Sequence, residues 1–374
     1  MQYVKFGNTG IEVSVLGFGA MRLPSEYKRG KTLFDYEESA RMMLRAHELG
    51  VNYFDTAPGY CDGESEIIVG RALKNIRGKV CIATKYPVKS DSASDCRRGL
   101  EKSLKQLDTD YIDFYHMWGI DLDTYESKIS VPNGPLAEVR KAKEEGLIRH
   151  ISFSFHDDAE NLVKIAEAGQ FETVLAQYNL LDRSNEKAIA RARELGLGIV
   201  AMGPVGGGRL GEPSEKIRAL SSKNITSNAE LALRFVLTNH NVHCALSGMS
   251  TMAQVEENCL IADRNEALTE KEIEAINASV AENKKLANLY CTECGYCMPC
   301  PHEVNIALCF RLMNYHRIYE ITDYARAEYK TIGKFEWMPG KDASHCTECG
   351  ECESKCPQKL AIREQLRETH SVLG

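Results

Sequence analysis

Eight short apolar segments, each followed by a stretch with helical periodicity, run from about residue 10 to about residue 285. They are VSVLGFG (13–19), VNYFD (51–55), VCIATK (80–85), YIDFYH (111–116), IRHISFS (148–154), TVLAQ (173–177), LGIVAM (197–202) and VHCALSG (242–248). Strands that alternate with helices pair in parallel, because each helix returns the chain to the same edge of the sheet. Eight such units in about 250 residues predict an α/β fold, a (β/α)8 TIM barrel.

An open doubly wound sheet is the alternative to the barrel. It is less favoured because no G-x-G-x-x-G follows the first apolar segment, and the GGG at 206–208 comes only after the seventh. The opening stretch YVKFGNTGIEVSVLG (3–17) predicts a hairpin that turns at Asn8-Thr9-Gly10. After Leu268, a further helix is expected to lead to the rest of the chain.

Eight of the fourteen cysteines lie in two runs, CTECGYCMPCP from Cys291 and CTECGECESKCPQ from Cys346. The first residues show no secretory pattern, so we expect a cytoplasmic protein in which these cysteines bind metal and do not form disulfides. The second run has the C-x2-C-x2-C-x3-C-P spacing that bacterial ferredoxins use for [4Fe–4S] clusters. Zinc in two sites of four cysteines each is the alternative, but three cysteines at successive x2 intervals together with the CP favour iron and sulfide.

In that ferredoxin pattern the fourth cysteine of each run binds the other cluster. Two clusters would then be held by two crossed sets: Cys291, Cys294, Cys297 and Cys356 for the first, and Cys346, Cys349, Cys352 and Cys300 for the second. The first run is one residue shorter between its third and fourth cysteines, which leaves uncrossed ligation open.

Charge and hydropathy exclude some classes of partner. The net charge is −7 and no basic block occurs, so we expect neither nucleic acid nor an anionic membrane surface as a partner. No apolar run approaches the roughly 18 residues that a membrane-spanning helix needs.

Polar residues that end the apolar segments are candidates for catalysis, because barrel enzymes place working groups at the carboxyl ends of the strands. Asp55, Lys85 and His116 end the second, third and fourth segments, and Tyr60 follows in the loop after Asp55. Each of these residues alone could be structural. Together, three of them at successive strand ends and Tyr60 in the adjoining loop predict an active site.

The stretches GFGAMRLP, NYFDTAPGYCDGESEIIVGRAL, ATKYP and IDFYHMW resemble the aldo-keto reductase family. The resemblance implies reduction of a small carbonyl substrate, or oxidation of the alcohol, with Tyr60 as proton donor. Lys85, paired with a buried Asp55, would lower the pKa of Tyr60 from about 10. His116 would orient the carbonyl or share the proton transfer. A buried lysine needs a carboxylate nearby, which agrees with these roles.

The resemblance also implies a nicotinamide dinucleotide across the barrel mouth. Its expected contacts are Gly19, Met21, Ser154, Gln177, Met202, Pro204, Gly206, Gly208, Leu210, Glu257 and Asn258. Phe155 replaces the family's asparagine, and Met202 replaces the aromatic that stacks on the nicotinamide. Gly248 and Gln254 stand where the family holds the 2′-phosphate with cations, so NADH is expected in preference to NADPH.

The tail resembles the α-helical ferredoxin type, and a barrel with such a tail resembles a branch of the family from anaerobes and archaea. We therefore expect a reductase barrel in residues 1–285 and a two-cluster domain in residues 286–374. Nicotinamide moves two electrons and a cluster moves one, so a flavin or a partner protein could mediate between them. Two alternatives stay open: clusters that are structural or sense redox state, and an electron-transfer or docking subunit whose barrel is not an active reductase.

Overall fold

The computed structural model describes residues 1–28, 31–208, 210–211, 225–264, 266–288, 291, 297–335, 338–356 and 359–374. The chain divides into two compact units. The barrel unit comprises Met1–Gly207 and Ala232–Leu268, and the C-terminal unit comprises Gly208–Leu231 and Thr269–Gly374. The domain boundary near residue 285 stays a prediction.

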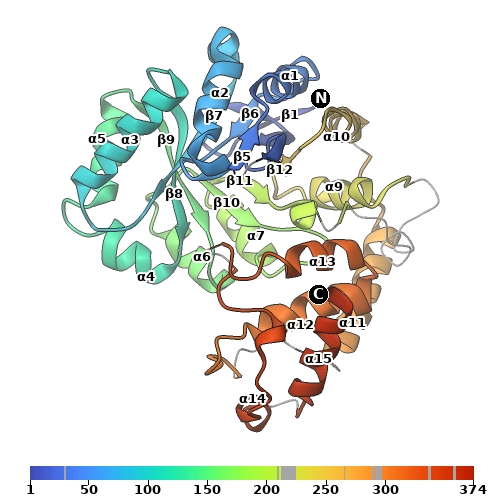
Figure 1. The fold of residues 1–374 in the computed structure, drawn as a ribbon. Helices are drawn as coiled ribbons and strands as arrows, with labels where there is room; N and C mark the ends of the chain where they lie inside the picture. Colours follow the sequence, from blue (N-terminus) through green and yellow to red (C-terminus); the bar gives the residue numbers. More distant parts are fainter. Residues whose placement is uncertain are drawn as a thin grey trace. The chain divides into compact units, whose positions relative to one another are not determined.

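Eight parallel strands close into a barrel in the order β10-β11-β12-β3-β6-β7-β8-β9, which confirms the predicted fold (Figure 1). The strands are β3 (Leu16–Gly19), β6 (Tyr53–Asp55), β7 (Cys81–Pro87), β8 (Ile112–Ile120), β9 (Ile148–Phe155), β10 (Thr173–Gln177), β11 (Gly198–Met202) and β12 (Cys244–Gly248). Each overlaps one of the eight apolar segments. The barrel is closed by pairing of β12 with β3, in which Gly248 lies opposite Gly19.

The predicted N-terminal hairpin is present and closes one end of the barrel. Strand β1 (Tyr3–Lys5) pairs antiparallel with β2 (Glu12–Ser14). Phe6, which is fully buried, lies edge-on to Phe114 with ring centroids 5.2 Å apart. A Cβ at Gly198, the first residue of β11, would lie 2.6 Å from the Phe6 ring, so the ring fills the amino end of the barrel.

Amphipathic helices surround the strands (Figure 1). Buried Leu162, Ile165 and Ala166 lie on one face of α6, as their spacing predicts. A second hairpin, β4 (Ser25–Lys28) with β5 (Lys31–Phe34), was not predicted. The helices of this part of the chain are α1 (Tyr36–Glu48), α2 (Ser65–Leu73), α3 (Ala93–Leu107), α4 (Leu122–Thr124), α5 (Pro135–Glu144), α6 (Ala159–Glu167), α7 (Glu186–Glu194), α9 (Asn228–Thr238) and α10 (Met252–Arg264).

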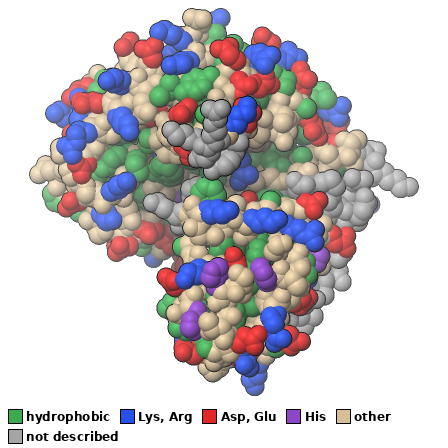
Figure 2. Space-filling model, viewed as in Figure 1, with side chains coloured by type: hydrophobic (Ala, Val, Ile, Leu, Met, Phe, Trp, Pro, Cys, Tyr) green, Lys and Arg blue, Asp and Glu red, His purple; other side chains and the backbone are tan. Residues whose placement is uncertain are grey.

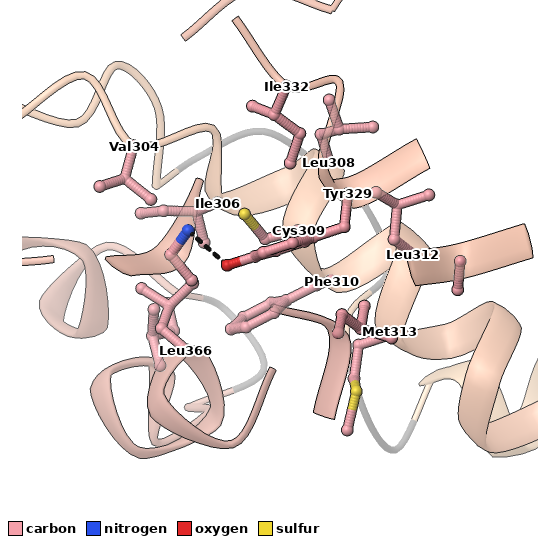
Figure 3. Packing of buried hydrophobic residues seen from close by; sticks show 14 of the residues in the cluster. Val304, Ile306, Leu308, Cys309, Phe310, Leu312, Met313, Tyr329, Ile332 and Leu366 are labelled. Atoms are coloured by element: carbon pink, nitrogen blue, oxygen red, sulfur yellow. Dashed lines mark hydrogen bonds between the residues drawn. The ribbon is translucent and has the colours of Figure 1, made fainter. Parts of the chain in front are cut away.

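The C-terminal unit is helical, as the resemblance to α-helical ferredoxins implies. It contains α11 (Glu270–Asn288), α12 (Ile306–Tyr319), α13 (Thr322–Tyr329), α14 (Glu351–Ser354) and α15 (Ile362–Leu373). Side chains of α12, α13 and α15 pack into one core, to which Phe310, Tyr329 and Leu366 belong (Figure 3). The Tyr329 hydroxyl accepts a hydrogen bond of 2.9 Å from the Ala343 N–H, which ties the segment before the second cysteine run to this core.

In the part of the chain that the structure describes, no helix combines the length and the apolar character needed to cross a bilayer. Acidic and basic side chains are interspersed over the face of the molecule seen in Figure 2.

Candidate functional site

Strand register brings three of the four predicted catalytic residues together. Asp55 is the last residue of β6, and β6, β7 and β8 are neighbours in the barrel. Lys85 on β7 lies directly opposite His116 on β8. Because the strands are parallel, these side chains gather towards the carboxyl end of the barrel, where TIM-barrel enzymes carry their active sites.

Lys85 and Asp55 form a buried ion pair. The Lys85 Nζ lies 2.5 Å from the Asp55 Oδ1 and 2.7 Å from the Thr56 carbonyl oxygen, which it also donates to. The two side chains are only 1% and 2% exposed. Burial lowers the pKa of Lys85, but Asp55 and Tyr60 together raise it by a larger amount, so the pKa ends above its ordinary value. The ammonium therefore stays charged, as a buried cation can only with a carboxylate beside it.

Tyr60 lies over this ammonium. It begins the one-turn helix Tyr60–Gly63 between β6 and α2, in which Cys61 and Asp62 both have a φ of 53°, a left-handed conformation that non-glycine residues seldom adopt. This turn places the Tyr60 ring centroid 4.8 Å from the Lys85 Nζ. Trp118, at the end of β8, packs edge-on against Tyr60 with ring centroids 5.6 Å apart, so it forms a wall beside the phenol.

The pKa of Tyr60 is higher than that of a free phenol, which differs from the expectation of a lowered value. Burial is the largest cause and raises the pKa, the charge and hydrogen bond of Lys85 lower it, and Asp55 raises it. The predicted effect of Lys85 is present, but burial outweighs it. The phenol is therefore held protonated at neutral pH, which is the form that donates a proton.

His116 is fully buried and neutral. Burial and then the charge of Lys85 lower its pKa to about 3. Its Nε2 lies 3.5 Å from the Tyr53 hydroxyl and 3.9 Å from the Asp55 Oδ2. A neutral imidazole can offer or accept a hydrogen bond, but it cannot supply a proton as an imidazolium near pH 7.

Two of the expected dinucleotide contacts, Ser154 and Gln177, lie on the next strands of the barrel. Ser154 is opposite Leu175 on β10, and Gln177 is opposite Met202 on β11. The buried Ser154 Oγ accepts a hydrogen bond of 2.7 Å from the Gly119 N–H. Phe155, at the position where the resemblance implies an asparagine, is buried.

The glycine loop after β11 has the backbone conformation that its sequence suggests. Gly206, Gly207 and Gly208 have φ values of 59°, 70° and 102°, a run that side chains other than glycine would strain. The Arg22 Nη1 donates to the Gly207 carbonyl oxygen at 2.6 Å. Pro204 lies in the turn before the loop and is buried, whereas Gly208 and Leu210 fall in the C-terminal unit.

The predicted adenosine contacts lie on α10 and near its start. The buried Asn258 side chain donates to the Ser247 Oγ at 3.1 Å, while Glu257 is exposed. The Gln254 Oε1 accepts a hydrogen bond of 2.8 Å from the Ser250 N–H. Of the remaining predicted contacts, Gly19 ends β3 and Met21 has an exposed side chain. These roles stay predictions.

The cysteines of the second predicted cluster set share one cavity. Cys300, Cys346, Cys349 and Cys352 all line it, although Cys300 belongs to the first run and the other three to the second. This shared lining agrees with crossed ligation in the identity of the cysteines, although the described His, Cys, Asp and Glu side chains form no group of three that is already arranged to hold a metal ion. Three of the first set, Cys291, Cys297 and Cys356, pack against the core of the same unit, and Cys294 lies outside the described residues.

Comparison with protein families agrees with this geometry. Residues 15–281 match the aldo/keto reductase family, and residues 290–361 match the 4Fe-4S dicluster domain. The chain belongs to the aldo/keto reductase family.

Relatives of this aldo/keto reductase cover the barrel. An oxidoreductase of Bacillus subtilis, described as uncharacterized, is 28% identical over 76% of this chain and 98% of its own length. L-galactose dehydrogenase of Arabidopsis thaliana is 29% identical over 72% and 92%. The NADH-specific methylglyoxal reductase of Escherichia coli is 26% identical over 69% and 92%. Among solved structures, the holo form of an aldo-keto reductase from Bacillus halodurans gives a TM-score of 0.64 at 28% identity, covering 74% and 96%.

Two residues near the site of this reductase were missed by sequence reasoning. Tyr53 lies within an apolar segment of the sequence, yet its hydroxyl faces His116. Arg22 lies within GFGAMRLP, yet it binds the glycine loop 185 residues away. The alternation of strand residues could have placed Tyr53 on the same face of β6 as Asp55. No local signal links Arg22 to Gly207.

Proposed function

We propose that this aldo/keto reductase transfers hydride between a nicotinamide cofactor and a small carbonyl or alcohol substrate, with Tyr60 as the proton donor. The observation that carries the proposal is the buried Lys85–Asp55 ion pair beneath the Tyr60 ring. A barrel with a purely structural role would not require a buried ammonium beside a phenol.

Each residue of the site has a separate task. The nicotinamide supplies or accepts the hydride when bound. Tyr60 gives its proton to the carbonyl oxygen, and Lys85 stabilises the phenolate that remains. Asp55 keeps Lys85 charged. His116, neutral because burial lowers its pKa to about 3, orients the carbonyl by a hydrogen bond and leaves proton donation to Tyr60.

An extended dinucleotide is the cofactor that we propose for the barrel mouth. Glycines allow backbone to approach a phosphate closely, and Gly207 lies in such a loop beside the guanidinium of Arg22. We favour NADH, because Gly248 and Gln254 offer no cation for a 2′-phosphate and the Gln254 side chain is engaged by the Ser250 N–H. A relative named as NADH-specific supports this preference.

We further propose that the C-terminal unit binds two [4Fe–4S] clusters through the crossed cysteine sets and exchanges electrons with a partner protein or a flavin. Support comes from the dicluster match and from the cavity that joins Cys300 to the second run. Cytoplasmic location in an oxygen-poor setting belongs to the same proposal. The alternative is an electron-transfer subunit with an inactive barrel, favoured by the apolar side chain at Phe155.

The test is carbonyl reduction by Tyr60→Phe. Anaerobically purified protein is assayed with NADH and NADPH against small aldehydes and ketones, methylglyoxal among them. Loss of the proton donor should lower kcat by at least about 10²-fold. Tyr36→Phe is the matched control: it removes a hydroxyl that donates to Glu64 at 3.0 Å and should leave turnover unchanged. Equal, measurable turnover in wild type and Tyr60→Phe would show that Tyr60 is not the proton donor. Absence of turnover in both would favour the electron-transfer alternative, and a preference for NADPH would overturn the cofactor assignment.

A further inference from the structure

Arg363 shares a cavity with the cysteines assigned to the second cluster. The residues that line the cavity include Cys300, Cys346, Cys349, Cys352 and Arg363. Arg363 lies in the first turn of α15, where backbone N–H groups that lack a partner within the helix add positive partial charge. The lining of the cavity therefore combines four cysteines with one cation.

The structure holds the Arg363 side chain over the cysteine loop. Its Cζ is 3.7 Å from the point that a Cβ on Gly350 would occupy, and Gly350 has a φ of 81°. Gly350 lies between Cys349 and Cys352. Glycine here serves two needs, a left-handed turn and close approach of the guanidinium to the backbone of the loop.

Glu353 fixes the direction of the guanidinium. One Glu353 carboxylate oxygen accepts from the Arg363 Nη2 at 2.8 Å, and the other accepts from the Arg363 backbone N–H at 3.0 Å. A second arginine of α15, Arg367, pairs with Glu348 at 3.1 Å one helical turn further on. Two ion pairs thus hold the loop of the second cysteine run against α15.

We propose that Arg363 raises the reduction potential of the cluster bound by Cys300, Cys346, Cys349 and Cys352. A [4Fe–4S] cluster with four thiolate ligands is an anion, and uptake of one electron makes it more negative. A nearby cation stabilises the reduced form more than the oxidised form, and net charge and hydrogen bonds to sulfur are among the influences that set cluster potentials. Arg363 supplies both a charge and N–H donors at the cavity wall.

The inference rests on the cluster assignment proposed above, and iron analysis reports on that assignment separately. Full-length protein, purified anaerobically and reconstituted with iron and sulfide, is titrated with dithionite while the reduced clusters are followed by electron paramagnetic resonance. In Arg363→Gln one midpoint potential should shift to more negative values and the other should stay in place. Arg363→Lys, which keeps the charge, should retain most of the wild-type potential.

Arg367→Gln is the matched control, since it removes an arginine of the same helix that pairs with the same loop. It should shift the potential less than Arg363→Gln does. Glu353→Gln, which removes the counter-charge, should shift the same midpoint in the positive direction, and it tests the proposal even if Arg363→Gln assembles poorly. Unchanged potentials in Arg363→Gln at full iron content, equal shifts in the two arginine variants, or a negative shift in Glu353→Gln would overturn the proposal.

Discussion

Replacement of Asp55 by asparagine isolates the electrostatic part of the site. Asparagine has nearly the same shape as aspartate but carries no charge, so Lys85 would keep a hydrogen-bond partner and lose its counter-ion. Burial, the largest influence on the pKa of Lys85, lowers that pKa, and only Asp55 and Tyr60 oppose it. In Asp55→Asn we therefore expect the amine to deprotonate more readily and Tyr60 to lose the cation beside it.

The size of the effect follows from burial. Both members of the pair are at most 2% exposed, and their charged atoms are 2.5 Å apart. Removing one partner of such a pair costs about 3–5 kcal/mol, because it leaves the other charge uncompensated. That is a large part of a typical unfolding free energy of about 5–15 kcal/mol. Loss of the cation that stabilises the phenolate should also lower kcat by at least about 10²-fold.

Asp113→Asn provides the matched control. Asp113 is a second fully buried carboxylate of the barrel, near the start of β8, and it pairs with Arg77 at 2.7 Å and Arg149 at 2.9 Å. Urea unfolding and NADH-dependent carbonyl reduction are measured for both variants at a temperature where both are folded. Both should lose stability, and Asp55→Asn alone should also lose most of its turnover.

Two results would refute this reasoning. If Asp55→Asn lost stability but kept wild-type kcat, Lys85 would not act on Tyr60 through its charge. If folded Asp113→Asn lost as much turnover as Asp55→Asn, the activity loss would report general damage to the barrel.

Two further predictions concern acid stability and cluster content. Burial is the main cause that lowers the pKa of both His116 and His243 to about 3; the charge of Lys85 adds to it at His116 and that of Arg193 at His243. Between about pH 6.5 and pH 3 the unfolded chain therefore binds protons at these histidines that the folded chain does not bind. The unfolding free energy should therefore fall as the pH drops through this window, by up to about 1.4 kcal/mol per pH unit for each histidine. In His243→Gln, the unfolding free energy measured by urea titration should change less steeply with pH than in the wild type. An unchanged dependence on pH would contradict this prediction. Cys349→Ala should lower bound iron from about eight atoms per chain towards four, and iron that stays near eight would show that the ligand assignment is wrong.

Much of the fold and part of the site could be predicted from sequence, because those features are local. The spacing of apolar residues that distinguishes a strand from a helix is set by the backbone geometry of a few neighbouring residues. Asp55, Lys85 and His116 were placed at one barrel end because parallel strands share an end. The β4–β5 hairpin was missed because it interrupts the strand–helix alternation within a few residues of β3.

The sequence by itself determined the eight-stranded barrel, the order of the four predicted catalytic residues and the spacing of the two cysteine runs, since each follows from short-range pattern and chain order. Tertiary structure decided the rest: the net rise of the Tyr60 pKa, the Tyr53 hydroxyl beside His116, and the guanidinium of Arg363 over Gly350. These depend on desolvation and on distances between residues that are remote along the chain. Both quantities arise only when the strands close and the helices pack.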